Sequence, residues 1–149
     1  MPHAELPKVA EWVMALKNAV GKLDKNTFFV GHSLGCVAVL RYIAVLAKNV
    51  QVGGCVFVAG FSGNLGIPEI SEFYSLPLDM EKAKSHCHKF VTIFSDNDEY
   101  VPLERSLEFQ KALGAKAILE RGKGHFTKGD GVTALPSVFE SMIEMSSKK

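Results

Sequence analysis

Short apolar runs that favour β-strands alternate along this chain with segments of helical periodicity, and this alternation constrains the fold more than any other feature. The β-prone runs are residues 27–30, 52–59, 90–94 and 115–119. Helical periodicity covers residues 6–20, 34–47, 79–85, 102–113 and a last segment that opens at Leu135-Pro136. Strands that alternate with helices form a parallel sheet with helices on both faces. We therefore expect one α/β domain over residues 1–149.

Several details of these elements can be predicted. The run 27–30 is short, largely apolar and β-prone, which favours a strand buried on both faces. Gly21 stands where a left-handed cap would end the first helix. Glycine and proline interrupt residues 60–78, so we expect a loop there with one helical turn near residues 71–74. The apolar residues of the last helix predict its inner face: Val138, Phe139, Met142 and Ile143.

The composition is that of an ordinary globular protein, with 47% hydrophobic and 22% charged residues. The formal net charge of +1 gives no bulk field for nucleic acid or an anionic membrane, so we expect neither as a partner. Three cysteines without a CxxC spacing are read as reduced and mostly buried. Charged residues interrupt any N-terminal signal sequence, and no apolar run is long enough to span a bilayer. These features predict a cytoplasmic protein.

The strongest chemical signal is the run Gly31-His32-Ser33-Leu34-Gly35, which lies between a predicted strand and a predicted helix. A G-x-S-x-G turn in this context holds a serine hydroxyl above the carboxyl end of the sheet, and close approach of neighbouring chain explains both glycines. The Leu34 N–H at the start of the helix can stabilise an oxyanion. The alternative is a glycine-rich turn that only packs or that cradles a phosphate.

A serine nucleophile needs a base, and the base needs an acid that orients it. The run from Ser95 to Tyr100 follows the third strand and contains Asp96 and Asp98, and His125 follows the fourth strand in a glycine-flanked loop. The alternative for His125 is a solvated loop histidine. Nucleophile, acid and base occur in the order Ser, Asp, His, each after a strand, as in α/β-hydrolases. We expect the Ser33 hydroxyl within hydrogen-bond reach of His125, at ~2.6–3.2 Å.

Three motifs together, G-H-S-L-G at 31–35, D-E-Y-V-P at 98–102 and G-H-F at 124–126, resemble the small serine hydrolases related to retinoblastoma-binding protein 9. This family is a compact branch of the α/β-hydrolase superfamily, and the resemblance covers nearly the whole chain. It implies a three-layer α/β-hydrolase fold with Ser33 as nucleophile, Asp98 as acid and His125 as base. Asp96 is then left with a turn-forming role, its side chain bonding nearby backbone N–H groups.

The chain departs from the family at its start. Members normally begin with a strand, a glycine-rich loop, a helix and a second strand, and that loop supplies a second oxyanion donor. No such segment precedes Ser33, so Thr27–Val30 is expected to be a sheet edge with Phe28, Phe29 and Val30 poorly covered. We expect the chain either to self-associate along this edge or to represent part of a longer protein.

The residues and the resemblance together predict a serine hydrolase that acts on small carboxylic esters or related acyl compounds, with no cofactor and no metal. The predicted substrate-binding residues are His32, Phe61 and Phe126. Four aromatic side chains are interpreted either as the lining of a pocket near Ser33 or as part of the hydrophobic core: Phe61, Phe73, Tyr74 and Phe126.

The run His86-Cys87-His88 is not expected to bind a metal, because three adjacent residues in regular structure cannot all point at one ion. The alternative function is a catalytically weak hydrolase-fold protein that acts as a binding or regulatory module.

Overall fold

The computed structural model describes residues 1–75 and 77–147 and contains a four-stranded parallel sheet with the order β1-β2-β3-β4. The strands are β1 (Phe28–His32), β2 (Gly54–Val58), β3 (Phe90–Ser95) and β4 (Lys116–Glu120). Because all four run in the same direction, their carboxyl ends meet at one edge of the sheet, where the loops after β1, β3 and β4 converge. The predicted α/β fold with a parallel sheet is confirmed.

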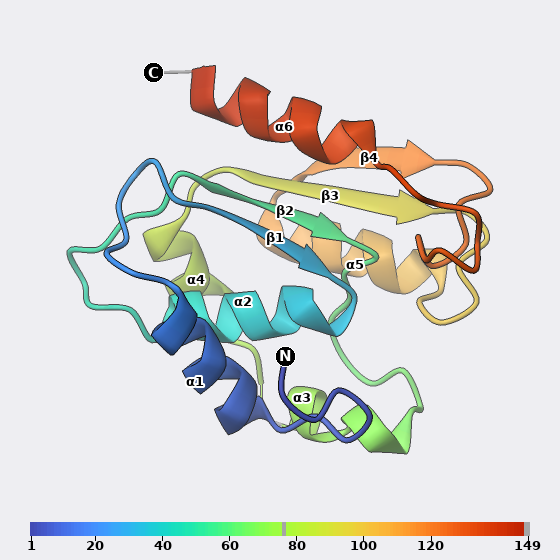
Figure 1. Ribbon diagram of the computed structural model, residues 1–149, viewed down its shortest axis with the longest axis horizontal. Coiled ribbons are helices and arrows are strands. Elements are labelled where there is room, and N and C mark those ends of the chain that lie inside the picture. Colours follow the sequence, from blue (N-terminus) through green and yellow to red (C-terminus); the bar gives the residue numbers. More distant parts are fainter. Residues whose placement is uncertain (76, 148–149) are drawn as a thin grey trace.

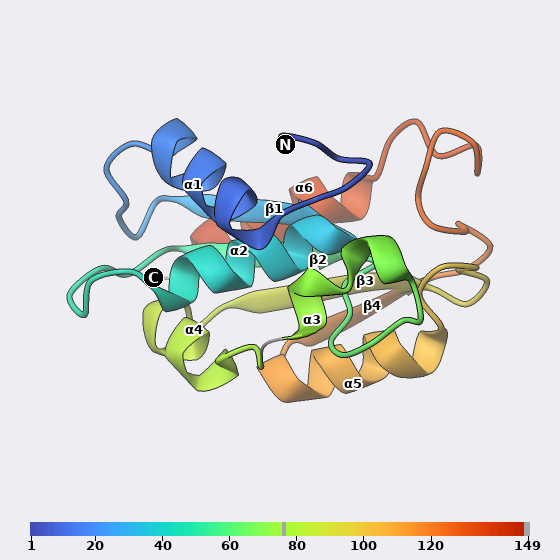
Figure 2. The ribbon, with the colours of Figure 1, turned by 90° about the horizontal axis from the view of Figure 1, so that it is seen from below.

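Helices cover both faces of this sheet, as Figure 1 shows, with α6 alone on one face and the other helices on the opposite one. The helical elements are α1 (Val9–Ala19), α2 (Leu34–Ala44), the 3-10 turn η1 (Pro68–Ile70), α3 (Glu72–Ser75), α4 (Met80–His86), α5 (Leu103–Leu113) and α6 (Pro136–Ser147). Seen from below, α2, α4 and α5 lie across the sheet, while α1 lies beside α2 and the short α3 lies in the excursion after β2 (Figure 2). The expected helical turn near residues 71–74 is therefore present, in a loop that otherwise lacks regular structure.

The strand β1 is an edge of the described sheet, as expected, but its side chains are better covered than predicted. Phe29 is buried on the helical face, with its ring 6.0 Å from that of Tyr42 in α2. Phe28 is partly buried against the cluster beneath α6, so only Val30 is largely exposed, at 48%. The expectation that Phe28 and Phe29 are exposed to water is wrong. An unpaired edge strand exposes its backbone N–H and C=O groups, whereas its side chains point to the two faces of the sheet, where helices can cover them. The side chains of β2 and β3 are buried on both faces of the sheet, whereas those of β1 are not.

One prediction about the helices is wrong, and another holds for only two of its four residues. The first helix ends at Ala19, and Val20 leaves it in an extended conformation while its side chain packs on the core, so Gly21 adopts no left-handed cap. In α6, Phe139 and Ile143 are exposed at 68% and 49%. Val138 and Met142 pack on the sheet as predicted, together with Met145, one turn further along the helix from Met142.

The three cysteines are free and buried, as predicted. In residues 1–75 and 77–147, no helix has the length and apolarity needed to cross a bilayer. The charge of the terminal residues Lys148 and Lys149 predicts that they are solvated, but both lie outside the described residues.

Candidate active site

Ser33 lies in the sharp turn between β1 and α2, with backbone angles φ 52° and ψ −122°. A positive φ is strained for a residue with a side chain and persists only where the surroundings enforce it. Here the Ser33 N–H donates to the carbonyl of Val58 at the end of β2, at 2.8 Å. The turn is thus fixed to the neighbouring strand, and it presents Ser33 at the carboxyl edge of the sheet.

The two glycines of the motif behave differently. A Cβ atom on Gly31 would lie 2.9 Å from both the N and the Cα of Cys36, and backbone at that distance cannot move aside cheaply. Close approach therefore requires glycine at position 31. A Cβ atom on Gly35 would meet nothing within 4 Å, so the same explanation is wrong for that position.

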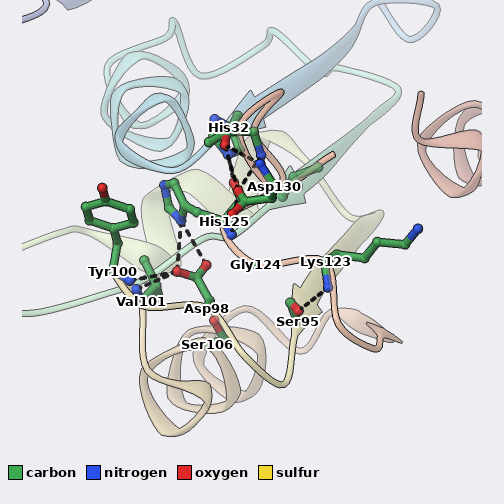
Figure 3. A network of polar contacts seen from close by, with 12 residues as sticks. His32, Ser95, Asp98, Tyr100, Val101, Ser106, Lys123, Gly124, His125 and Asp130 are labelled. Atoms are coloured by element: carbon green, nitrogen blue, oxygen red, sulfur yellow. Dashed lines mark hydrogen bonds and ion pairs between the residues drawn. The ribbon is translucent and has the colours of Figure 1, made fainter. Parts of the chain in front are cut away.

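His125 and Asp98 form a direct pair, drawn in Figure 3. The ring atom Nδ1 lies 2.8 Å from one carboxylate oxygen and 3.0 Å from the other. Their side chains are only 12% and 2% exposed. A histidine held through Nδ1 by a buried carboxylate carries its proton on Nδ1 and leaves Nε2 as the basic atom.

The Asp98 carboxylate also accepts the N–H groups of Tyr100 and Val101, each at 2.9 Å. Burial opposes ionisation of this group, but the hydrogen bonds from His125, Val101 and Tyr100 outweigh it and hold the pKa of Asp98 below its ordinary value. Asp98 is therefore an anion that closes the turn after β3 and also holds the ring of His125.

Asp96 does not make the local turn that was expected of it. Its carboxylate accepts the N–H of Gly122 at 2.8 Å and pairs with Arg121 at 3.3 Å, in the loop after β4. The expectation failed because the turn after β3 is already closed by Asp98, which leaves Asp96 to bond across to the neighbouring loop.

His32, which immediately precedes Ser33, contacts His125. Its Nε2 donates to the backbone carbonyl of His125 at 2.8 Å, and the two ring centroids are 4.8 Å apart. Packing in this corner removes water from the ring and lowers the pKa of His32, although a bond to the His125 carbonyl partly opposes the shift. Tyr100 lies on the His125 ring as well, with centroids 5.0 Å apart.

Within the described part of the chain, the Ser33 hydroxyl and the His125 Nε2 make no hydrogen bond. The predicted bond between these two side chains is thus not formed in this structure. Catalytic hydrogen bonds of this kind are often long without substrate and tighten when it binds. The Leu34 N–H opens α2 and has no acceptor inside that helix, which leaves it available to an oxyanion.

The predicted substrate-binding residues lie in two separate places. His32 and Phe126 line one cavity of about 250 Å³ together with Val58 and Leu135. Phe61 is 1% exposed and belongs to the core cluster that contains Trp12, Leu34 and Phe73. It also lines a second cavity of about 260 Å³, beside Val37, Phe73 and Tyr74. The structure therefore brings His32 and Phe126 together and leaves Phe61 apart from them.

Sequence reasoning missed four residues that contact the site: Ser95, Asn97, Tyr100 and Asp130. The first three belong to the polar run that begins with the last residue of β3, and this run was interpreted only for its aspartates. Any side chain at the carboxyl end of a parallel strand can reach the loop after the neighbouring strand, and that placement was the available signal.

The run His86-Cys87-His88 is divided among different surroundings. His86 is buried with Nδ1 2.8 Å from the Val50 carbonyl, and Cys87 is buried with its Sγ 3.7 Å from that of Cys55. His88 is exposed. These three side chains do not share one site.

Comparison with known proteins identifies the family of this chain. The family model described as serine hydrolase matches residues 2–144. The putative hydrolase YdeN of Bacillus subtilis is 31% identical over 150 residues, which is 100% of this chain and 79% of YdeN. The crystal structure of that gene product has a TM-score of 0.92 and covers 99% of this chain and 80% of its own.

Two further proteins extend the comparison. The serine hydrolase RBBP9 of Rattus norvegicus is 30% identical over 128 residues, or 85% of this chain and 66% of RBBP9. A carboxylesterase structure from Nitrososphaera gargenis shares the fold, with a TM-score of 0.70 at 12% identity over 99% of this chain and 76% of its own. The match over residues 2–144, together with relatives of about 30% identity, leads to one conclusion: this chain belongs to the serine hydrolase family.

Proposed function

We propose that the protein cleaves carboxylic esters or related acyl compounds through Ser33, His125 and Asp98. The observation that carries the proposal is the buried pair of Asp98 with His125 Nδ1, at 2.8 Å, on the same sheet edge as the strained turn of Ser33. A carboxylate that holds Nδ1 frees Nε2 to accept a proton, and a serine in such a turn is exposed to a substrate.

The proposed reaction uses only groups of this chain. His125 Nε2 takes the proton of Ser33 as the serine oxygen attacks the acyl carbon, and Asp98 stabilises the resulting imidazolium. The Leu34 N–H donates to the oxyanion that develops on the substrate. The imidazolium returns its proton to the leaving alcohol, and water then releases the acyl group from Ser33 by the same steps.

The acyl class is supported by the family and by one neighbour in fold. Members of the serine hydrolase family supply the general chemistry, and the Nitrososphaera gargenis protein of the same fold is a carboxylesterase. The cavity of about 250 Å³ lined by His32 and Phe126 has the size of a short acyl or alcohol group and is largely apolar in its lining residues. We propose that His32 and Phe126 contact the substrate there, and that Phe61 contributes only through the second cavity.

The test is covalent labelling with a fluorophosphonate probe, which reacts with activated serines. We expect the wild-type chain to be labelled at Ser33, as read by mass spectrometry of the labelled peptide, and Ser33→Ala to be unlabelled. Ser146→Ala, at an exposed serine near the end of α6, is the matched control and should label as the wild type does.

A series of p-nitrophenyl esters of increasing acyl length then measures hydrolysis. A wild-type chain that is neither labelled nor active on any ester would overturn the proposal. That result would favour the alternative function, a hydrolase-fold binding or regulatory module.

A further inference from the structure

Four successive backbone N–H groups ahead of the histidine ring are all held by side chains. Backbone N–H groups in loops need acceptors, and the usual ones are backbone carbonyls. Here the four bonds run from Gly122 to Asp96 at 2.8 Å, from Lys123 to Ser95 at 3.0 Å, from Gly124 to Asn97 at 2.8 Å and from His125 to Asp130 at 3.1 Å. The position of this loop therefore depends on four side chains, three of which are consecutive in the sequence, at the end of β3 and directly after it.

Asn97 is the central member of this set. Its Oδ1 accepts the Gly124 N–H at 2.8 Å and the Ser95 hydroxyl at 2.7 Å. Ser95 is the last residue of β3 and is 1% exposed, so the amide of Asn97 is fixed against the buried end of a strand. The bond to Gly124 thus ties the loop after β4 to a rigid part of the sheet.

The bond made by Asn97 lies next to the pair that the proposed mechanism uses. Asn97 directly precedes Asp98, and Gly124 directly precedes His125. The link from Asn97 to Gly124 and the link from Asp98 to His125 are therefore two neighbouring ties between the same two loops. With both in place, the distance and the angle between the carboxylate and the ring have little freedom.

We propose that Asn97 is a positioning residue for His125, which acts through the N–H of Gly124 and sets where the ring meets Asp98 and Ser33. This inference rests on the proposed function of Ser33, His125 and Asp98. The Asn97 side chain acts here through its Oδ1 atom, which accepts from Gly124 and Ser95. Its role is distinct from that of Asp98, because it touches the backbone of the loop and not the ring.

The test compares Asn97→Ala, Asn97→Asp and a matched control, Asp24→Ala. Asn97→Ala removes the acceptor, whereas Asn97→Asp keeps an oxygen in the same place. Asp24 accepts the Asn26 N–H at 2.8 Å in an exposed turn before β1, at the opposite edge of the sheet. Its alanine variant therefore also loses a side-chain acceptor, at a place remote from Ser33.

Two readouts are measured on each variant, together with its melting temperature. The first is the rate at which the fluorophosphonate probe labels Ser33. The second is the far-downfield proton resonance of a histidine ring bonded to a carboxylate, which reports the His125–Asp98 pair without any turnover.

We expect Asn97→Ala to be labelled about 10- to 100-fold more slowly, the loss typical of a misplaced catalytic group, and to lose or broaden the resonance. Asn97→Asp should restore both to within a few-fold of the wild type, and Asp24→Ala should change neither. The proposal is overturned if Asn97→Ala keeps the resonance and the labelling rate, or if Asn97→Asp is as impaired as Asn97→Ala at an unchanged melting temperature. If the wild type shows the resonance but is not labelled, the proposed function fails while the resonance still decides the role of Asn97.

Discussion

The turn that carries Ser33 and the loop that carries His125 lie at the same edge of the sheet, but they are held in different ways. The serine turn is held by backbone, through the bond from Ser33 N–H to the Val58 carbonyl and the close contact of Gly31 with Cys36. The histidine loop is held by side chains at the end of β3 and directly after it, and by Asp130.

This difference has a consequence for how each region responds to change. Backbone packing tolerates substitution of exposed side chains but not an added Cβ atom at a close contact. A loop held by side-chain acceptors behaves in the opposite way, because each bond can be removed singly while the backbone remains free to adjust. Apart from Ser33 itself, we expect variants of the serine turn to affect mainly stability, and variants around the histidine loop to affect mainly reactivity.

The largest expected effect separates the two aspartates after β3. Asp98→Asn should slow labelling of Ser33 by about 10³- to 10⁴-fold, because the amide favours the wrong histidine tautomer. Asp96→Asn keeps an oxygen that can accept the Gly122 N–H and should change the rate only slightly. If Asp96→Asn gives the large loss and Asp98→Asn does not, the assignment of the acid is reversed.

The second prediction concerns the serine turn itself. Gly31→Ala should lower the free energy of unfolding by about 1–3 kcal/mol, since the new methyl group overlaps the backbone of Cys36. Gly35→Ala is the matched control. It has open space around the new Cβ atom and lies inside α2, so it should raise the free energy of unfolding by up to ~1 kcal/mol. Urea unfolding measures both, and equal effects would contradict the distinction between the two glycines.

A smaller effect is expected at the far side of the histidine loop. Asp130 accepts the N–H groups of His125 and Thr127, at 3.1 Å and 2.9 Å. Asp130→Ala should slow the labelling of Ser33 several-fold with little change in melting temperature. Lys128→Ala, an exposed position in the same loop, should label at the wild-type rate. A loss of stability without a change in rate at Asp130 would show that this part of the loop is not held as the comparison requires.

The smallest effect is a dependence on pH. Because packing lowers the pKa of His32 below its ordinary value of 6.5, the unfolded chain binds this proton more strongly than the folded chain does. The contribution of His32 is therefore fully present above about pH 6.5 and is lost as the pH falls through the lower folded pKa.

His32→Gln tests this dependence, since its amide can keep the bond to the His125 carbonyl without titrating. We expect the stability of this variant to decline less than that of the wild type between neutral and mildly acid pH. His88→Gln, at an exposed histidine before β3, should follow the wild-type curve. Identical curves for His32→Gln and the wild type would rule out a role for His32 in acid sensitivity.

Local patterns account for most of the fold and part of the candidate site. The four strands, the five main helices and the strained turn at Ser33 follow from periodicity and from glycines within a few residues of one another. Asp98 and His125 follow strands whose carboxyl ends meet, so their placement at one edge follows from a parallel sheet. The self-association predicted for the Thr27–Val30 edge stays a prediction, and the coverage of Phe29 by α2 removes part of its original reason.

By itself, the sequence determined the alternating architecture, the serine turn and the order of the candidate catalytic residues, because these depend on backbone preferences and on apolar spacing over short stretches. Tertiary structure alone decided that Asn97 holds Gly124, that His32 bonds to a carbonyl 93 residues further along the chain, and that Phe61 lies apart from Phe126. It also decided that Phe139 and Ile143 of α6 are exposed and do not pack on the sheet. Each of these depends on how two distant segments are rotated and spaced against each other, and a hydrogen bond or a packed face changes partner over a shift of one residue. No local pattern carries that information.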